Sequence, residues 1–483
     1  DYVLVTHAHI DHVGLLPLIY ARGFRGQIMA TRATCDLCDI MLKDCAHIQE
    51  SEAEWKNRKA MRAGKPEVTP IYTMNDAEGV LHHFVPCNYN EIIRLNDKLE
   101  IRFVDVGHLL GSASIEIWMK EDDCSKKIVF SGDIGNKNKP LIRSPQYIRQ
   151  ADYVVMESTY GGRFHKNTGD HVEEFARVIQ ETLDKGGNVV IPAFAVGRTQ
   201  ELLYYFRQIK AQRLIHGHDN FEVYVDSPLA IEATNVFNKN VKSCFDEDAL
   251  EIIEKGINPL VFPGLKTTIT SDESRMINFD TKPKVILSAS GMCEAGRIRH
   301  HLKHNLWKKE STICFVGYQA VGTLGRKLIE GAECVKLFGE TVEVNAKIES
   351  LKGISGHADR NGLLDWLSGF ENTPQHVFVV HGEDQVTDTF AEAITEKFGW
   401  PAMAPYSGGC VDLATGEILS VGIKEPKKAV EKPAQIRKQN AFYRVVAAAK
   451  RLLDVVYKNE GLANKELMKF ENQINNLADK WDR

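Results

Sequence analysis

Four candidate metal ligands lie within six residues near the start of the chain, in the stretch DYVLVTHAHIDHVG. They are His7, His9, Asp11 and His12. Imidazole and carboxylate together are the ligands that zinc and its transition-series neighbours prefer. In an extended loop, His7 and His9 can point the same way and bind one ion, while Asp11 and His12 face a second point. A single histidine at a strand end is usually an ordinary polar residue, but this combination indicates a metal site.

Three further candidate ligands each follow an apolar stretch. His108 lies in DVGHLLGSAS, between glycines that allow close backbone approach; Asp133 ends VFSGD, and His381 ends VFVVH. Each residue alone could be a capping histidine, a turn aspartate or a core histidine. Together with the first four they supply seven ligands of the types that a two-metal centre requires, with the Asp133 carboxylate suited to bridge two cations.

The elements that position these ligands are predicted to be strands of an α/β fold, because apolar β-type stretches alternate with helical stretches over most of the chain. Ligands at strand ends are typical of α/β proteins. The expected strands before the ligands lie in residues 2–5, 98–107, 126–133 and 151–159. Further strands are expected in 221–230, 282–292, 312–319 and 375–384.

The length of 483 residues predicts two to four domains of about 100–200 residues each. We expect a first part over 1–164, an inserted nucleotide-fold-like domain over 165–345, a second part over 346–423, and a charged linker with a C-terminal helix over 424–483. The chain starts inside a strand and with aspartate rather than methionine. We therefore expect an N-terminally shortened version of a longer protein.

The composition is that of a globular protein, with 43% hydrophobic and 26% charged residues. No stretch approaches the roughly 20 apolar residues that cross a bilayer. The formal charge of −5 gives no global support for nucleic-acid binding, so any such surface must be local. Ten scattered cysteines fit a reducing environment better than a disulfide framework, which predicts a cytoplasmic protein.

The motifs taken together resemble the β-CASP family of metallo-β-lactamase-fold nucleases. The matching positions are HxHxDH at 7–12, His108, Asp133, Glu157 in MESTYGG, His357 in SGHADR and His381 in VVHGE. They occur in the family's order, and the resemblance covers roughly residues 1 to 420.

The resemblance implies an αββα sandwich with a β-CASP domain inserted at 165–345 and an RNA-metabolising motif within 346–423. The family normally has several strands before HxHxDH, and these are absent here. We therefore expect the first sheet to be incomplete.

The resemblance also implies roles for the site residues. Two zinc ions per chain, for which manganese could substitute, would be held by His7, His9 and His108, by Asp11, His12 and His381, and by Asp133 between them. The candidate catalytic residues are His357, Glu157 and Asp11. His357 would be the general acid for the leaving sugar oxygen, and Glu157 would fix its tautomer and raise its pKa. The expected products carry a 5′-phosphate and a 3′-hydroxyl.

A basic stretch, SASGMCEAGRIRHHLKHNLWKK at 288–309, is a candidate substrate surface. Its small-residue loop could present backbone N–H groups to a phosphate. Arg297, His301 and His304 recur at helical spacing and would form one basic face for a phosphate backbone, although such runs are commonly just solvated. The candidate substrate-binding residues are Ser288, Ser290, Arg198, Arg297, His301 and Arg326.

The leading hypothesis is a zinc-dependent ribonuclease that acts on single-stranded RNA in RNA processing or decay. It predicts endonucleolytic cleavage and leaves 5′→3′ exonucleolytic degradation open; a homodimer is implied by the resemblance alone. One alternative is an Artemis-like DNA nuclease, although that branch commonly has valine at the position of His381. A small-molecule ester or thioester hydrolase on the same core is a second alternative, and a non-catalytic scaffold is a third.

Overall fold

The computed structural model describes residues 1–62, 64, 66–165, 171–351, 355–424, 445, 448–449, 452–453, 455–456, 459 and 464–481. The chain divides into two compact units, Asp1–Gly422 and Ile423–Arg483. Every candidate site residue lies in the first unit. The second contains α16 (Asn464–Trp481), at the position of the predicted C-terminal helix, whereas 425–444 of the predicted linker lie outside the described residues. No helix in the described part of the chain is long and apolar enough to cross a membrane.

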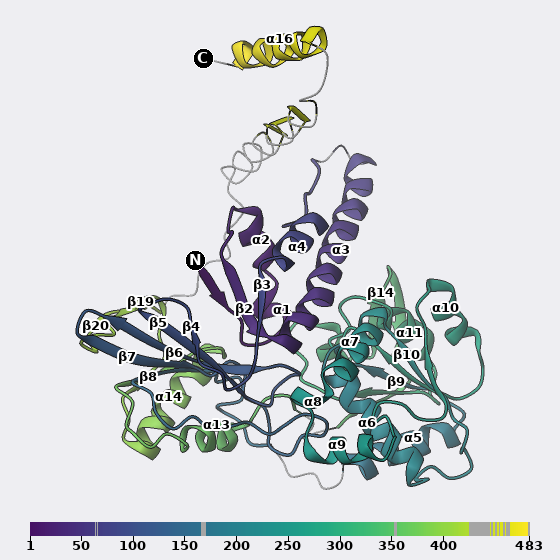
Figure 1. Cartoon of the computed structure of the whole chain (residues 1–483). Coiled ribbons are helices and arrows are strands. Elements are labelled where there is room, and N and C mark those ends of the chain that lie inside the picture. The colour runs from purple at the N-terminus through teal and green to yellow at the C-terminus, as the bar shows by residue number, and fades with distance from the viewer. Residues whose placement is uncertain are drawn as a thin grey trace. The chain divides into compact units, whose positions relative to one another are not determined.

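A seven-stranded sheet, in the order β18-β17-β8-β7-β6-β5-β4 (Figure 1), supports three of the seven candidate ligands, His108, Asp133 and His381. Its strands are β4 (Ile93–Arg94), β5 (Leu99–Asp105), β6 (Ala113–Glu121), β7 (Cys124–Phe130), β8 (Tyr153–Met156), β17 (His376–Val379) and β18 (Ala402–Met403). The pairs β18–β17, β17–β8 and β8–β7 are parallel, and the pairs β7–β6, β6–β5 and β5–β4 are antiparallel. Strands β5, β7, β8 and β17 therefore run in the same direction, and their carboxyl ends meet at one edge.

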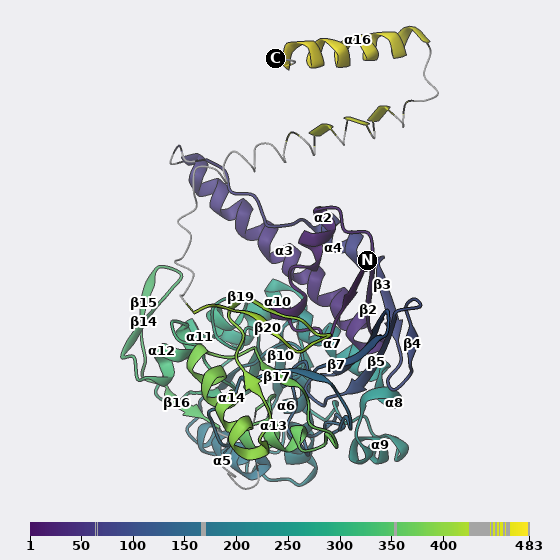
Figure 2. The same ribbon diagram turned by 90° about the vertical axis from the view of Figure 1, so that its left-hand side faces the viewer.

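Two helices cover one face of this sheet, α13 (Arg360–Leu367) and α14 (Asp384–Phe398); Figure 2 shows them in front of β17. Trp366 and Phe390 of these helices pack in one buried cluster with Met156 of β8. Burying large apolar side chains contributes about 1.5–3 kcal/mol each. The helices therefore hold the sheet edge that carries the candidate ligands.

A three-stranded parallel sheet, β1-β2-β3, lies on the other side and starts the chain. Its strands are β1 (Tyr2–Leu4), β2 (Gln27–Thr31) and β3 (Phe84–Cys87), with helices α1 (Ile10–Val13), α2 (Leu16–Ala21), α3 (Arg32–Arg62) and α4 (Met74–Leu81). Met29 and Cys87 of this sheet pack against Phe103 and Ile115 of the larger one. The carbonyl of Thr6 accepts the N–H of Ala113 at 2.8 Å, which ties the end of β1 to the start of β6.

A second large sheet lies in the middle of the chain and is parallel throughout, in the order β11-β10-β12-β9-β13-β16. Its strands are β9 (Val189–Pro192), β10 (Val223–Asp226), β11 (Leu265–Thr267), β12 (Val285–Ser288), β13 (Thr312–Phe315) and β16 (Lys347–Ser350). The surrounding helices are α5 (His171–Asp184), α6 (Arg198–Ala211), α7 (Pro228–Lys239), α8 (Val241–Cys244), α9 (Glu247–Glu254), α10 (Ser271–Phe279), α11 (Ile298–Asn305) and α12 (Leu324–Ile329).

Both faces of this parallel sheet are buried, as its apolar strands require. In β9, Val190 packs in one cluster and its neighbours Val189 and Ile191 pack in another. Five of the six strands lie within the predicted insertion 165–345, and β16 follows it, so the sheet continues beyond that boundary. Two hairpins complete the described strands: β14 (Cys334–Leu337) with β15 (Glu340–Glu343), and β19 (Ser407–Val411) with β20 (Ile418–Ile423). The predicted α/β fold is confirmed.

Candidate metal centre

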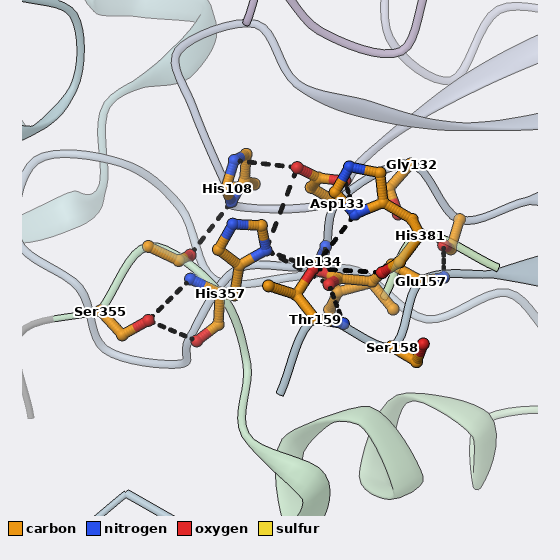
Figure 3. Close-up of polar contacts among 12 residues, drawn as sticks. His108, Gly132, Asp133, Ile134, Glu157, Ser158, Thr159, Ser355, His357 and His381 are labelled. Atoms are coloured by element: carbon orange, nitrogen blue, oxygen red, sulfur yellow. Dashed lines mark hydrogen bonds and ion pairs between the residues drawn. The ribbon is translucent and has the colours of Figure 1, made fainter. Parts of the chain in front are cut away.

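Four candidate ligands and the candidate catalytic residue Glu157 lie together because each follows the carboxyl end of a strand. The residues are His7 after β1, His108 after β5, Asp133 after β7, Glu157 after β8 and His381 after β17. Since β5, β7, β8 and β17 end at one sheet edge, and β1 is tied to that edge through Thr6, the side chains converge (Figure 3). This is where α/β folds usually place their sites.

Local backbone geometry positions two of these ligands. Gly107 has a φ of 64°, and a Cβ at this position would lie only 2.6 Å from the carbonyl oxygen of Arg143. Glycine is therefore required in the turn that delivers His108. His381 itself has a φ of 49°, in the left-handed region that side chains rarely adopt. Such conformations are concentrated at functional sites.

The first donor group consists of His7, His9, His108 and Asp133, whose donor atoms all lie within 4.8 Å of one another. Oδ2 of Asp133 is 3.3 Å from Nε2 of His7 and 3.5 Å from Nε2 of His108. The Nδ1 atoms of these two imidazoles are 3.1 Å from Oγ1 of Thr6 and the carbonyl oxygen of Gly356, respectively. These contacts occupy Nδ1 and leave Nε2 facing the carboxylate, as outer partners of metal-binding histidines do.

The second donor group consists of Asp11, His12 and His381. Oδ1 of Asp133 is 3.5 Å from Nε2 of His12 and 3.7 Å from Nδ1 of His381. The two oxygens of one carboxylate thus face two separate donor groups. The Asp11 side chain is 64% exposed and that of His381 is 35% exposed, whereas His7 is fully buried. The centre therefore opens to solvent on the side of the second group.

The chemistry of the donors fits divalent cations. Nε2 of His7, Nε2 of His12 and Oδ1 of Asp133 are buried and have no hydrogen-bond partner within the described part of the chain. Leaving such atoms unpaired costs about 1–3 kcal/mol each, and cations bound at both donor groups would satisfy all three.

The protonation states of the buried donors also fit. Burial lowers the pKa of His7 and of His108, and it lowers the pKa of His9 to about 3. Burial opposes ionisation of Asp133, but the neighbouring His12 and His7 outweigh it and hold the pKa of that carboxyl well below its usual value. Neutral imidazoles around an ionised carboxylate are the state that binds metal.

At the exposed edge the metal-free protein carries a proton on an imidazole. The Asp11 carboxylate beside His381 raises the pKa of that imidazole to about 9, against the effect of burial. A cation that binds His381 would displace this proton.

His357 and Glu157 form a separate pair beside Asp133. Nδ1 of His357 donates to Glu157, at 3.1 Å from Oε1 and 3.2 Å from Oε2. Glu157 also accepts the N–H of Ile134 at 2.6 Å, which fixes the carboxylate (Figure 3). Burial lowers the pKa of His357, but the Glu157 carboxylate outweighs it and the pKa is raised. The pair has the expected contact, and its catalytic role stays a prediction.

Three contacts around the centre involve residues that the motifs did not single out. Oγ1 of Thr159 lies 3.1 Å from Nδ1 of His381, the Gly356 carbonyl accepts from His108 as described above, and Oγ of Ser355 donates to the carbonyl of His357 at 3.2 Å. Their positions inside MESTYGG and SGHADR are the sequence signal that could have identified them.

The predicted basic face at 288–309 is not a single solvent-exposed surface. Asp226, at the end of β10, is fully buried, and its Oδ1 accepts from Arg297 at 2.7 Å while its Oδ2 accepts from Nε2 of His301 at 2.6 Å. Oγ of Ser288 donates to the Asp226 carbonyl at 2.9 Å. His301 is fully buried. The prediction of one basic face through Arg297, His301 and His304 is wrong, because His301 is buried and both His301 and Arg297 are hydrogen-bonded to the buried Asp226 carboxylate.

The other substrate-binding candidates do not join the metal centre. Arg198 pairs with Glu201, one turn further along α6, and Nε of Arg326 donates to Glu330 at 2.6 Å on α12. Ser290 is half-buried and accepts the N–H of Ala295 at 3.5 Å. Their contact with a substrate stays a prediction.

We expect Asp226→Ala to destabilise the protein by about 3–5 kcal/mol at pH 7, because it leaves Arg297 and His301 without their buried partner. Burial would raise the pKa of Asp226, but the hydrogen bonds of His301, Ser274 and Thr268 outweigh it and hold the pKa below its usual value. A depressed pKa stabilises the fold above the unfolded value of about 3.9, and this contribution is lost as the pH falls below it.

Urea unfolding of Asp226→Ala and wild type at pH 7 and at pH 3.5 measures this difference. The gap between the midpoints should be largest at pH 7 and should narrow at pH 3.5. Asp272→Ala is the matched control, since that carboxylate is 89% exposed and pairs only with Arg275 on its own helix. An equal gap at both pH values would contradict the assignment of an ionised, hydrogen-bonded Asp226.

Two family models match the chain. The Beta-Casp domain matches residues 199–328, and the Zn-dependent metallo-hydrolase RNA specificity domain matches residues 341–405. The first match includes most of the parallel sheet, and the second includes His357 and His381. Together with the donor groups around Asp133, these matches define a metal-dependent hydrolase.

Similar proteins identify the family. Ribonuclease TTHA0252 from Thermus thermophilus is 37% identical over 387 residues, which are 80% of this chain and 82% of the relative. Transcription termination factor FttA from Methanocaldococcus jannaschii is 31% identical over 407 residues, 82% of this chain and 61% of the relative. FttA from Pyrococcus abyssi is 29% identical over 414 residues, 84% of this chain and 61% of the relative. The chain thus spans about three fifths of the length of both FttA proteins. The chain belongs to the β-CASP family of hydrolases with the metallo-β-lactamase fold.

Proposed function

We propose that this protein is a zinc-dependent ribonuclease that hydrolyses phosphodiester bonds of single-stranded RNA in the cytoplasm. The reaction is endonucleolytic, with 5′→3′ exonucleolytic degradation as a second activity. The observation that carries the proposal is the Asp133 carboxylate, whose two oxygens face two separate groups of histidine and aspartate donors. The 37% identity to a relative named ribonuclease, over 82% of that relative, supports RNA as the substrate.

The donor groups would hold one zinc ion each. His7, His9 and His108 form one set, Asp11, His12 and His381 form the other, and Asp133 contributes to both. When bound, the two ions would activate water at neutral pH and stabilise the negative charge that develops on the phosphoryl oxygens.

The protein's own residues complete the reaction. His357 donates a proton to the departing 3′ oxygen, and its proton-bearing form is favoured by Glu157, which accepts from Nδ1 and leaves Nε2 directed away. The buried first group keeps His7, His9 and His108 neutral. The exposed second group leaves room for an RNA strand to approach. The expected products carry a 5′-phosphate and a 3′-hydroxyl.

Cleavage of a 5′-labelled single-stranded RNA tests this function, with a matched DNA strand, a thioester and bis(p-nitrophenyl) phosphate assayed in parallel. We expect internal cuts in RNA, loss of cutting with a chelator and recovery with zinc. Equal cutting of DNA would favour the DNA-nuclease alternative. Intact RNA with rapid thioester turnover would favour a small-molecule hydrolase, and no turnover of any substrate by the metal-loaded protein would favour the scaffold.

A further inference from the structure

A cluster of two tyrosines and an arginine lies beside His357 and has no part in the chemistry described so far. The Tyr160 ring centre is 5.8 Å from the ring centre of His357 and 6.5 Å from that of Tyr318. The Arg163 guanidinium is 5.6 Å from the Tyr160 ring centre and 5.3 Å from the Tyr318 ring centre. Both tyrosines are half-buried and Arg163 is exposed. The cluster therefore leaves part of each tyrosine side chain and a cation accessible to solvent.

Hydrogen bonds hold the loop of this cluster next to the segment that carries the candidate general acid, His357. The N–H of Arg360 donates to the Arg163 carbonyl at 3.0 Å, and Nε2 of His165 donates to the His357 carbonyl at 3.0 Å. The N–H of His165 also donates to Oδ2 of Asp359 at 2.8 Å. These hydrogen bonds connect the loop that carries Tyr160 and Arg163 to the segment that carries His357. Tyr318 comes from a different element, the loop after β13.

Arg163 is an arginine of this neighbourhood that remains for a ligand. Arg198 and Arg326 lie near Tyr160 and Tyr318, and each pairs with a glutamate of its own helix. Arg163 makes no ion pair with any carboxylate among the residues that the structure describes. A guanidinium beside aromatic faces is suited both to a phosphate and to the π-face of a base.

The direction of the reaction decides which nucleotide would lie here, and this step rests on the proposed function. Cleavage to a 5′-phosphate and a 3′-hydroxyl breaks the P–O3′ bond, so the leaving oxygen belongs to the nucleotide on the 5′ side of the cut. His357 gives its proton to that oxygen. The nucleotide beside His357 is therefore the one immediately 5′ of the cut, and the tyrosine rings lie next to it.

We propose that Tyr160, Arg163 and Tyr318 form a binding subsite for the nucleotide immediately 5′ of the scissile bond. Its base stacks on the Tyr318 ring, and Arg163 binds its phosphate. Stacking on an aromatic ring accepts every base, because each base has a π-face, so the subsite gives affinity rather than sequence preference. The subsite holds the leaving oxygen within reach of His357.

RNA substrates that lack one base test the subsite. Once the cut is mapped, the base is removed from the nucleotide either immediately 5′ or immediately 3′ of it. For wild type we expect kcat/KM to fall about 10-fold with the 5′ abasic substrate, mainly through KM, and much less with the 3′ one. Tyr318→Leu should lose about 10-fold on intact RNA, with no further loss on the 5′ abasic substrate. Tyr318→Phe, which keeps the ring, should behave as wild type.

Two controls make the result decisive. Bis(p-nitrophenyl) phosphate has no nucleobase to stack on Tyr318. A folded Tyr318→Leu variant should therefore hydrolyse this substrate at the wild-type rate. Trp55→Leu removes another exposed ring with a stacked cation, Lys59 at 3.5 Å on α3, and should leave RNA cleavage unchanged.

Three outcomes would overturn the subsite. The first is that Tyr318→Leu cleaves intact RNA with the wild-type kcat/KM. The second is that kcat/KM of this variant falls by a further factor of about 10 on the 5′ abasic substrate. Either result would leave the ribonuclease proposal standing. If wild type leaves RNA intact while it cleaves bis(p-nitrophenyl) phosphate, the ribonuclease proposal fails and the subsite fails with it.

Discussion

We expect Asp133→Ala to lose RNA cleavage by about 10⁴-fold or more and to lose bound metal at the same time. One carboxylate faces both donor groups, with Oδ2 at 3.3 Å from His7 and Oδ1 at 3.5 Å from His12. Its removal takes a negative donor from both ions at once. Two-metal catalysis depends on both ions for several kcal/mol of transition-state stabilisation, and each 1.36 kcal/mol corresponds to a factor of ten.

Metal content per chain, measured by mass spectrometry on the same preparation as the activity, checks this expectation. Wild type should carry two equivalents of zinc and the variant clearly fewer. Asp152→Asn is the matched control, because that carboxylate accepts the N–H of Lys127 at 2.7 Å in the same sheet and has no contact with the donor groups. If Asp133→Ala keeps both metal equivalents and its activity, Asp133 does not bridge a two-metal centre.

The second large effect is expected for His357→Ala, with a loss of about 10²–10⁴-fold in kcat, the usual contribution of general acid catalysis. Metal content should not change, because Nδ1 of the imidazole is hydrogen-bonded to Glu157 at 3.1 Å and lies farther, at 3.9 Å, from Oδ2 of Asp133. The loss should shrink strongly on a uridine p-nitrophenyl phosphodiester. A p-nitrophenolate leaves without a proton, so a missing general acid matters little there.

Steady-state rates on both substrates, beside metal analysis, distinguish the roles that His357 could have. An equal loss on RNA and on the p-nitrophenyl ester would mean that His357 is not the general acid. Reduced metal content would instead assign it to the metal centre. His376→Asn is the control, since His376 begins the same strand that leads to His381 and donates from Nε2 to the Gly416 carbonyl at 3.1 Å, beside the Phe378 ring.

Much of the fold could be predicted because apolar strands that end in ligands are a local signal. The stretches 98–107 and 126–133 contain β5 (Leu99–Asp105) and most of β7 (Cys124–Phe130). Strand β6 (Ala113–Glu121) was not expected, although SIEIW alternates apolar and polar residues. The segment before β6, around His108, is rich in glycine and predicts a loop. The start of β6 therefore has no clear signal in the sequence.

Site residues that form a local sequence motif could be predicted, whereas contacts between residues far apart in the sequence could not. HxHxDH predicts its chemistry through residue type and spacing alone, and the structure groups its donors with His108, Asp133 and His381 from distant strands. The partners of Asp226 could not be read from the sequence, because Arg297 and His301 follow it by 71 and 75 residues. In the structure, Ile298, Leu302 and Asn305 form the buried face of α11. His301 lies on that same face, and the apolar spacing of Ile298 and Leu302 is the local signal for its burial.

Strands β8 and β17 are neighbours in one sheet, yet the whole parallel sheet separates them along the chain. During translation, six of the seven donors, up to Asp133, leave the ribosome long before His381 does. At about 5–20 residues per second, the intervening roughly 250 residues take some 12–50 s to synthesise. Until residue 357 is synthesised the nascent polypeptide lacks the candidate general acid, and until residue 381 it lacks the last histidine of the second donor group. The complete donor set of the proposed ribonuclease therefore forms only after the whole parallel sheet from β9 to β16 has been synthesised.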